Sequence, residues 1–238
     1  PFNGMVMAQT GNRIAEQFGI TREEADLFAI ESHIRAHNAH KKGNFKEYHV
    51  AVEHENGVLK TDEGIRPNSS IESLSTLKPV FDENGVVTAG NASQISDGAA
   101  ACLVMSRRKA EQLELTPLAT VTGYCATGVN SVDVMSAPIP TVQKLWKMNN
   151  REGEKDYDLY EHNEAFASAS LGVMQGLHLK HEKLNVNGGA VAMGHPLGAS
   201  GCRIVLALIH ALRQSGGKRG FATACLGGGM ATAIELEI

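Results

Sequence analysis

Apolar residues recur at helical spacing in two stretches near the start of the chain. Residues 12–19 predict a short helix that Gly19 ends, because glycine readily adopts the left-handed conformation of a helix terminus. Thr21 and Glu24 have the spacing of a capping box and predict a second helix that runs to about Lys42. Within it the apolar residues follow helical spacing, namely Leu27, Phe28, Ile30 and Ile34.

The middle of the chain changes from loop to alternating strands and helices. Residues 48–53 alternate between apolar and polar and predict a strand, whereas residues 54–79 predict a turn-rich loop region with one short helix. The apolar run Ala99–Met105 has the character of a strand. A helix over residues 107–113 and a strand over residues 118–124 follow it. This alternation is typical of α/β proteins.

The C-terminal part continues the same alternation. Its predicted elements are a helix from about Thr141, a strand over 157–161, a helix from Asn163 through Met174, a glycine turn at 187–189, a helix from Ala199 to Gln214, and strands over 220–226 and 230–237. The sequence therefore predicts an α/β fold with a boundary near residue 115.

Composition narrows the class of protein. Of the 238 residues, 42% are hydrophobic, 20% are charged and 25 are glycine, which indicates a soluble globular protein with many tight turns. The formal net charge of −4 provides no broad basic field, so we expect neither nucleic acid nor a membrane surface as the main partner.

Cysteine usage and the absence of long apolar runs bear on the compartment. The four cysteines form no CxxC pair and are expected to be free thiols in a reducing compartment. We find no run of 18 apolar residues and no signal-peptide pattern, and expect a cytoplasmic protein. The chain opens at Pro1 without a methionine, so an organellar targeting segment could be missing from this start.

Two reactive side chains near the end of the chain lie among glycines. His195 lies between Gly194 and the segment Gly198-Ala199-Ser200-Gly201, and Cys225 precedes the turn Gly227-Gly228-Gly229. Glycines leave backbone N–H groups free to converge on an anion and allow a substrate to approach closely. We interpret the pair as catalytic, against the alternatives of a core cysteine and a hydrogen-bonded structural histidine.

Neighbouring residues extend this candidate site. The helix that begins after His195 offers backbone donors to an anion, although the string matches no nucleotide-phosphate loop. Asn163 lies where a strand meets a helix, and its amide could orient a water or an oxyanion, or simply cap the helix. His33 and His37 stand four apart but lack a third ligand, so we expect a solvated helix face and no metal site.

Three motifs in this order resemble those of one enzyme family. Asn163-Glu164-Ala165-Phe166-Ala167, Gly194-His195-Pro196-Leu197-Gly198 and Cys225-Leu226-Gly227-Gly228-Gly229 are similar to the C-terminal motifs of the thiolases, the acetyl-CoA acetyltransferase and 3-ketoacyl-CoA thiolase family. Upstream, Thr88-Ala89-Gly90-Asn91-Ala92-Ser93 resembles the segment that lines that family's pantetheine channel. The resemblance implies a layered α/β fold: a loop domain over coenzyme A at residues 1–85, the last elements of the N-terminal half at 86–115 and a complete βαβαβαββ half at 116–238.

The resemblance also implies a reaction, the Claisen condensation of acyl-CoA thioesters or its reverse, with coenzyme A as substrate and no permanently bound cofactor. His195 would activate a nucleophilic thiol, Cys225 would be the acid and base at the α-carbon, and Asn163 would hold a water of one oxyanion hole. The backbone N–H of Gly227 would serve the other oxyanion hole. The implied contacts to coenzyme A or the acyl group are Ser93, Arg66, Phe81, Met135, Phe166 and Met7.

The sequence departs from the family pattern in its N-terminal part. The family's acyl-accepting cysteine should lie upstream of this chain, and Cys102, Cys125 and Cys202 are better interpreted as core residues. We therefore expect this chain to lack the N-terminal nucleophile half, which a missing segment or a partner chain would supply. The expected assembly is a homo-oligomer or a complex with the chain that carries that half. Val6 also stands where many short-chain members have histidine, which leaves acyl chain length open.

Two other functions compete with this one. The chain could be a non-catalytic subunit that binds coenzyme A or acts as a scaffold in a thiolase-like assembly. It could also be a hydrolase in which Cys225 is the nucleophile and His195 its base. Coenzyme A affinity without turnover distinguishes the first alternative, and acylation of Cys225 distinguishes the second.

Overall fold

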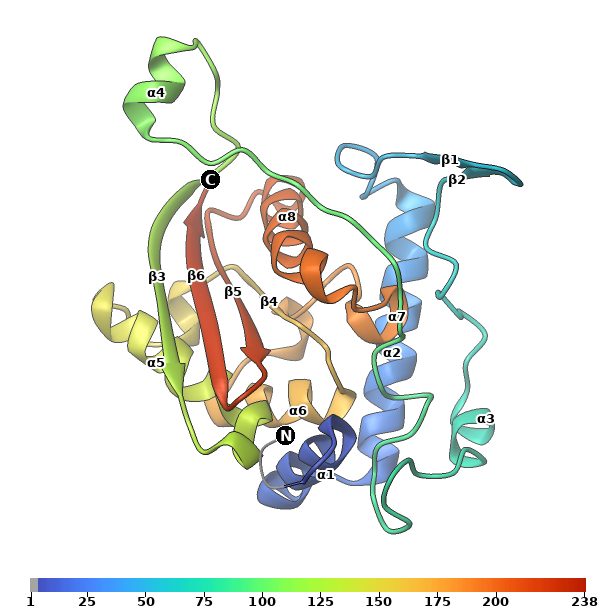
Figure 1. Ribbon diagram of the computed structural model, residues 1–238. Helices are drawn as coiled ribbons and strands as arrows, with labels where there is room; N and C mark the ends of the chain where they lie inside the picture. Colours follow the sequence, from blue (N-terminus) through green and yellow to red (C-terminus); the bar gives the residue numbers. More distant parts are fainter. Residues whose placement is uncertain (1–3) are drawn as a thin grey trace.

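A four-stranded mixed sheet forms the centre of the computed structural model, which describes residues 4–238 (Figure 1). In spatial order its strands are β3 (Thr120–Gly128), β6 (Met230–Glu237), β5 (Arg219–Leu226) and β4 (Leu159–His162). β4 and β5 are parallel, and the other neighbours are antiparallel. The resemblance implies five strands in this half, but the sheet of the described residues has four, and Leu184 is joined to Tyr160 of β4 only by an isolated parallel bridge. The α/β fold and the four strands predicted from residue 118 onwards are confirmed.

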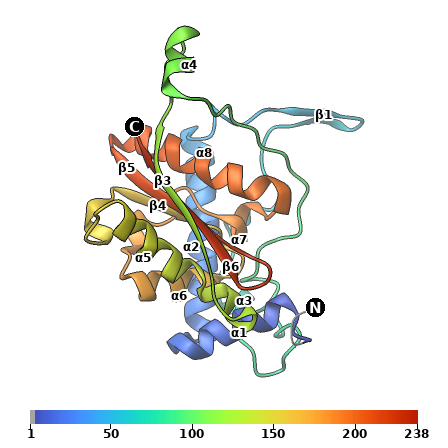
Figure 2. The same cartoon turned by 60° about the vertical axis from the view of Figure 1, so that its left-hand side comes forward.

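Helices cover the two faces of this sheet (Figure 2). α5 (Pro138–Met148) and α6 (Ala167–Leu177) pack on one face, and α8 (Leu197–Ser215) packs on the other. The alternation of side chains along the strands explains both contacts. Tyr160 and Phe221 point into the α5–α6 layer, whereas their neighbours Leu159 and Ala222 point towards α8. The ends of β4 and β5 are thereby fixed between buried layers.

The two N-terminal helices pack beside this core. α1 (Met7–Phe18) begins earlier than predicted, and α2 (Arg22–Lys42) matches the expected bounds. The capping box is present, because the side chain of Thr21 accepts the N–H of Glu24. Gly19 ends α1 in the left-handed conformation, as expected, and Gly43 ends α2 in the same way. Among the apolar residues of α2, Phe28 is buried, whereas Leu27 and Ile34 are 50% and 38% exposed.

The region after α2 is mostly loop, and the strand predicted over residues 48–53 is present only from Val52 onwards. Residues 43–48 form turns, with Phe45 buried and stacked on His49. β1 (Val52–His54) and β2 (Gly57–Leu59) form a separate exposed hairpin. The short helix expected in this region is α3 (Ile71–Ser75). Aromatic packing around Phe45 and His49 therefore takes the place of the first residues of the expected strand.

The run Ala99–Met105, which was expected to have the character of a strand, does not form one. A strand needs a neighbour for its hydrogen bonds, and nothing among residues 4–238 pairs with this run. Leu103 and Val104 are 87% and 81% exposed, and Cys102, expected in the core, is exposed too. α4 (Arg107–Gln112) follows and stands away from the body (Figure 1). This segment is an apolar surface without a cover in the described chain.

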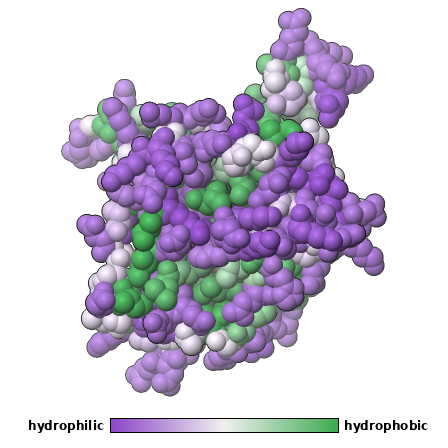
Figure 3. All heavy atoms as spheres, turned by 180° about the vertical axis from the view of Figure 1, so that it is seen from behind, coloured by the Kyte–Doolittle hydropathy of each residue, from purple (hydrophilic) through white to green (hydrophobic). Residues whose placement is uncertain are grey.

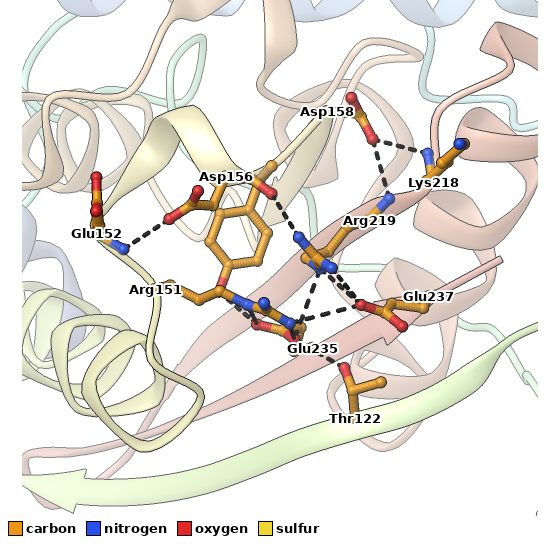
Figure 4. A network of polar contacts seen from close by, with 10 residues as sticks. Thr122, Arg151, Glu152, Asp156, Asp158, Lys218, Arg219, Glu235 and Glu237 are labelled. Atoms are coloured by element: carbon orange, nitrogen blue, oxygen red, sulfur yellow. Dashed lines mark hydrogen bonds and ion pairs between the residues drawn. The ribbon is translucent and has the colours of Figure 1, made fainter.

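Buried charges tie the C-terminal strand to the loop after α5 (Figure 4). Glu235 is fully buried and accepts hydrogen bonds from Arg151 (2.7 Å), Tyr157 (2.5 Å) and Thr122 (2.8 Å). Although burial raises the pKa of this carboxyl, the contacts with these partners hold it at about 2. The network locks β3 and β6 against the rest of the sheet.

The remaining short elements are η1 (Ser131–Ser136), η2 (Glu154–Asp156), η3 (His181–Lys183) and α7 (Ala190–Met193). Seen from behind, the surface is mostly hydrophilic, with hydrophobic residues gathered in separate patches (Figure 3). Within residues 4–238, none of the helices combines the length and apolar character needed to cross a bilayer.

Candidate functional site

The C-terminal ends of β4 and β5 bring two of the predicted residues to one edge of the sheet. Asn163 follows β4 directly, and its N–H donates to the carbonyl of Thr223 in β5 (3.0 Å). Cys225 lies two residues further along β5. Because the two strands are parallel, both residues lie at the same end of the sheet, where β4 and β5 have their C-termini. The alternative in which Asn163 caps the next helix is wrong, since Phe166 is the N-cap of α6.

His195 reaches this edge from the loop between α7 and α8. Gly194 precedes it with a φ of 92°, a conformation that favours glycine, and the N–H of His195 donates to the carbonyl of Gln94 (3.1 Å). The imidazole Nε2 lies 3.3 Å from Nδ2 of Asn163. The structure thus places His195 in contact with Asn163, whose backbone is hydrogen-bonded to the strand that carries Cys225.

The electrostatic setting keeps His195 neutral. Burial lowers the pKa of the half-buried imidazole, and the positive charge of Arg203 on α8 lowers it further. A neutral imidazole has one nitrogen free to accept a proton. His195 therefore has the charge state that a general base requires at neutral pH.

The thiol of Cys225 lies in an apolar setting. Its Sγ is 3.8 Å from the sulfur of Met135, and it packs on the cluster that contains Phe166. Burial raises the pKa of this thiol to about 11, although a hydrogen bond with its own backbone acts to lower it. The glycine surroundings suggested a place for a thiolate, but the resting form at neutral pH is the protonated thiol.

A hollow of about 260 Å³ opens beside the glycine turn after β5. Gly227, Gly228, Met7 and Val134 are among its lining residues. Nothing lies within 4 Å of the place where a Cβ of Gly227 would be, so this backbone faces open space. Met135 is 1% exposed and lies under Cys225 instead of lining the hollow.

The three residues implied for coenzyme A lie in different settings. Ser93 is half-buried beside the Asn163 motif, and its N–H donates to the carbonyl of Ala165 (2.9 Å). Arg66 is exposed. Phe81 is 71% exposed at a φ of 63°, which is strained for a bulky residue. Among residues 4–238, no hydrogen bond joins Phe81 to Ser93 or Arg66.

Gln94 links two of these regions, and sequence reasoning missed it. Its side-chain amide donates to the carbonyls of Gly64 (2.9 Å), Ala192 (3.1 Å) and Val191 (3.2 Å). Gly64 lies two residues before Arg66, and a Cβ there would lie 2.2 Å from the Gln94 side chain. The loop that carries Arg66 is therefore fastened to the loop that carries His195. A lone glutamine between two motifs gave no signal of this role.

Glu164 anchors the segment that leads to His195. Its buried carboxylate accepts hydrogen bonds from Ser32 (2.7 Å), Asn185 (2.8 Å) and the N–H of Val191 (3.2 Å). Gly189 packs so closely on this carboxylate that a Cβ would lie 2.2 Å from it. Glu164 belongs to the motif that begins at Asn163, but the sequence did not reveal this contact.

The histidine pair on α2 is not a solvated face. His33 is 4% exposed, and its Nδ1 accepts the backbone N–H of Arg66 (3.1 Å). Burial and the Arg66 charge lower the pKa of His33 to about 4. Among residues 4–238, no group of three His, Cys, Asp or Glu side chains has the arrangement of a metal site.

Comparisons with known proteins agree on one family. The description "Thiolase, N-terminal domain" matches residues 1–108, and "Thiolase, C-terminal domain" matches residues 115–238. The N-terminal match corrects the expectation that the N-terminal half is absent as a whole, because part of what that family description covers is present.

Curated relatives and solved structures cover the chain almost completely. The acetyl-CoA acetyltransferase of Chromobacterium violaceum is 44% identical over 241 residues, covering 99% of this chain and 61% of the relative. That of Cupriavidus necator is 43% identical over 242 residues, with the same two shares. The chain thus spans about three fifths of the length of these relatives.

The Bacillus anthracis acetyl-CoA acetyltransferase superposes with a TM-score of 0.94 at 38% identity, over 100% of this chain and 61% of that one. Human mitochondrial 3-ketoacyl-CoA thiolase in complex with CoA superposes with a TM-score of 0.92, also at 38% identity, over 98% of this chain and 59% of that one. With the family descriptions covering both parts of the chain and the fold shared along its length, this protein belongs to the thiolase family.

Proposed function

We propose that this chain provides the C-terminal part of a thiolase-type active site, which joins two acyl-CoA thioesters by Claisen condensation or cleaves 3-ketoacyl-CoA in reverse. The contact between His195 and Asn163 at 3.3 Å, beside the strand that carries Cys225, is the observation that supports it most. Coenzyme A is the proposed substrate, with no permanently bound cofactor.

Each residue of the proposed site has a distinct task. His195 accepts the proton of a nucleophilic thiol, and Asn163 holds a water that completes an oxyanion site. The Oδ1 of Asn163 is buried and has no hydrogen-bond partner within residues 4–238, which leaves an acceptor available for such a water.

Cys225 is the acid and base at the α-carbon. Its raised pKa suits the step in which the thiol gives a proton to the enolate carbon released by cleavage. The backbone N–H of Gly227 is proposed to stabilise the enolate oxygen, at a residue where the place of a Cβ is open space.

The remaining proposed contacts surround the substrate. We assign Arg66 to the phosphates of coenzyme A, Ser93 to pantetheine and the exposed ring of Phe81 to the adenine side. Met7 lines the hollow beside Gly227, so it is proposed to contact the acyl group together with Phe166 and Met135.

The acyl-accepting nucleophile is proposed to come from outside this chain. Cys102 is exposed on an uncovered segment, Cys125 donates to the carbonyl of Thr141 on α5, and Cys202 lies on α8. The exposed apolar run Ala99–Met105 supports the idea that a further region packs there. That region would belong to a longer polypeptide or to a partner chain. The proposed assembly is a homo-oligomer or a complex with that partner chain. The four free thiols favour a reducing compartment such as the cytoplasm.

A fusion to the N-terminal part of the Cupriavidus necator relative tests this function. The fusion should cleave acetoacetyl-CoA in the presence of coenzyme A. Cys225→Ala should lower α-proton exchange of acetyl-CoA by roughly 10²–10⁴-fold, because general acid–base catalysis contributes about that much. Cys202→Ala is the matched control and should retain exchange.

Three outcomes would contradict the proposal. A folded fusion that binds coenzyme A through Arg66 and Ser93 without turnover indicates a binding subunit. Covalent acylation of Cys225 indicates a hydrolase. Cleavage by this chain alone shows that no outside nucleophile is needed.

A further inference from the structure

The two ring nitrogens of His195 have different partners. Nε2 faces the side-chain amide of Asn163 at the sheet edge (3.3 Å). Nδ1 faces the hydroxyl of Ser200 on the first turns of α8 (2.6 Å). A neutral imidazole carries its proton on only one of these nitrogens, and the choice decides which nitrogen can act as a base.

The hydroxyl of Ser200 has a second partner that fixes its direction. Ser200 is 3% exposed, and its Oγ donates to the carbonyl of Pro196 (3.0 Å), one helical turn earlier. A carbonyl can only accept, so this bond uses the single hydroxyl proton. The Oγ of Ser200 can then only accept from His195, which places the proton of the imidazole on Nδ1.

The contact on the other side of the ring agrees with this assignment. The Nδ2 of Asn163 is an amide donor, so the Nε2 that it faces must offer a lone pair. The buried setting and the nearby Arg203 keep the ring neutral, so only one proton has to be placed.

We propose that Ser200 is a positioning residue that holds His195 as the Nδ1–H tautomer and so leaves Nε2 as the proton acceptor. The consequence for catalysis rests on the proposed function. When a thiol gives its proton to Nε2, the products are a thiolate and an imidazolium that carries N–H on both nitrogens. The Nδ1–H···Oγ bond to Ser200 is the same before and after, so the ring need not turn during the transfer.

The tautomer can be measured without any catalysis. In the chain labelled with ¹⁵N-histidine, long-range ¹H–¹⁵N correlation should show Nδ1 of His195 protonated and Nε2 unprotonated at neutral pH. Ser200→Ala removes the acceptor and should move at least half of the population to the Nε2–H tautomer. Ser200→Thr keeps the hydroxyl and should restore the Nδ1–H form.

The chain offers a matched control in a second buried histidine–serine pair. Nδ1 of His162 lies 2.8 Å from Oγ of Ser170, and both residues are buried. Ser170→Ala should alter the His162 signals and leave the His195 tautomer unchanged. If it changes His195 as much as Ser200→Ala does, the effect is a general loss of packing and the proposal is wrong.

The unsubstituted chain, called the parent chain below, tests the proposal even if Ser200→Ala fails to fold. An Nε2–H tautomer of His195 in the parent chain overturns the proposal outright. In the fusion described above, Ser200→Ala should slow acylation of the nucleophile on the order of 10–10²-fold while KM for coenzyme A stays within about twofold.

Failure of this inference and failure of the proposed function give different results. The expected tautomer in a fusion without cleavage leaves the inference standing and removes the function. Cleavage by a fusion whose His195 is the Nε2–H tautomer supports the function and overturns the inference.

Discussion

Single residues decide the charge states in this protein through what surrounds them. Cys225 and Glu235 both lie in or beside the C-terminal strands, yet their acidities shift in opposite directions. An apolar setting raises the pKa of Cys225, whereas the contacts with Arg151, Tyr157 and Thr122 hold that of Glu235 low. The sequence identified Cys225 as reactive from its glycines, but the network around Glu235 left no local signal.

Glu235 should make the protein sensitive to acid. Its pKa falls from an ordinary 4.5 to about 2 in the folded chain, so the stabilisation is complete above pH 4.5 and is lost as pH falls towards 2. Glu235→Gln should cost roughly 3–5 kcal/mol at pH 7, because it removes the buried carboxylate that pairs with Arg151. It should also flatten the loss of stability below pH 4.5.

Urea denaturation between pH 2 and 7 measures both effects. Glu237→Gln is the control, because Glu237 contacts Arg219 and Arg151 but its side chain is 37% exposed. It should cost no more than about 1 kcal/mol. Equal losses in the free energy of unfolding for the two substitutions would mean that the burial of Glu235 does not set the size of the effect.

Whole elements position the site through close backbone packing. Gly188 precedes α7 and the loop to His195, with a φ of 81°. A Cβ at this position would lie 2.6 Å from the carbonyl oxygen of Ser32 and 2.8 Å from Ala36, both on α2. The loop that presents His195 therefore depends on an approach to α2 that only glycine permits.

Gly188→Ala should lower the free energy of unfolding by at least about 2 kcal/mol, since it combines left-handed strain with a clash. Gly201→Ala, inside α8 with open space around it, is the matched substitution and should stabilise the chain by roughly 0.5–1 kcal/mol. Thermal unfolding followed by circular dichroism compares the two. A neutral Gly188→Ala would show that the loop can move away from α2.

At the scale of the whole molecule, the segment 99–105 crosses the body to reach α4, which stands away from it (Figure 1). The exposed side chains of Leu103 and Val104 form an apolar surface that other proteins of this size seldom leave open. The chain alone is therefore expected to self-associate or to require a covering region.

Leu103→Lys with Val104→Lys should reduce self-association of the isolated chain, measured by sedimentation velocity across a tenfold concentration range. Val50→Lys changes a residue that is also 85% exposed but lies in the loop before β1, and should leave self-association unchanged. The double substitution should weaken assembly with the N-terminal part of a relative. Unchanged self-association would place the contact elsewhere.

The sequence by itself determined the helices with clear caps, the C-terminal alternation of strands and helices, and the motifs of the thiolase family. These features are local, since capping residues, side-chain periodicity and glycines act within a few positions of the chain. Only the tertiary structure decided that His195 meets Asn163 and that Met135 lies under Cys225. It likewise showed that Ala99–Met105 has no strand partner among the described residues. Those outcomes depend on which distant segments become neighbours, and pairing, burial and charge shifts exist only once those neighbours are in place.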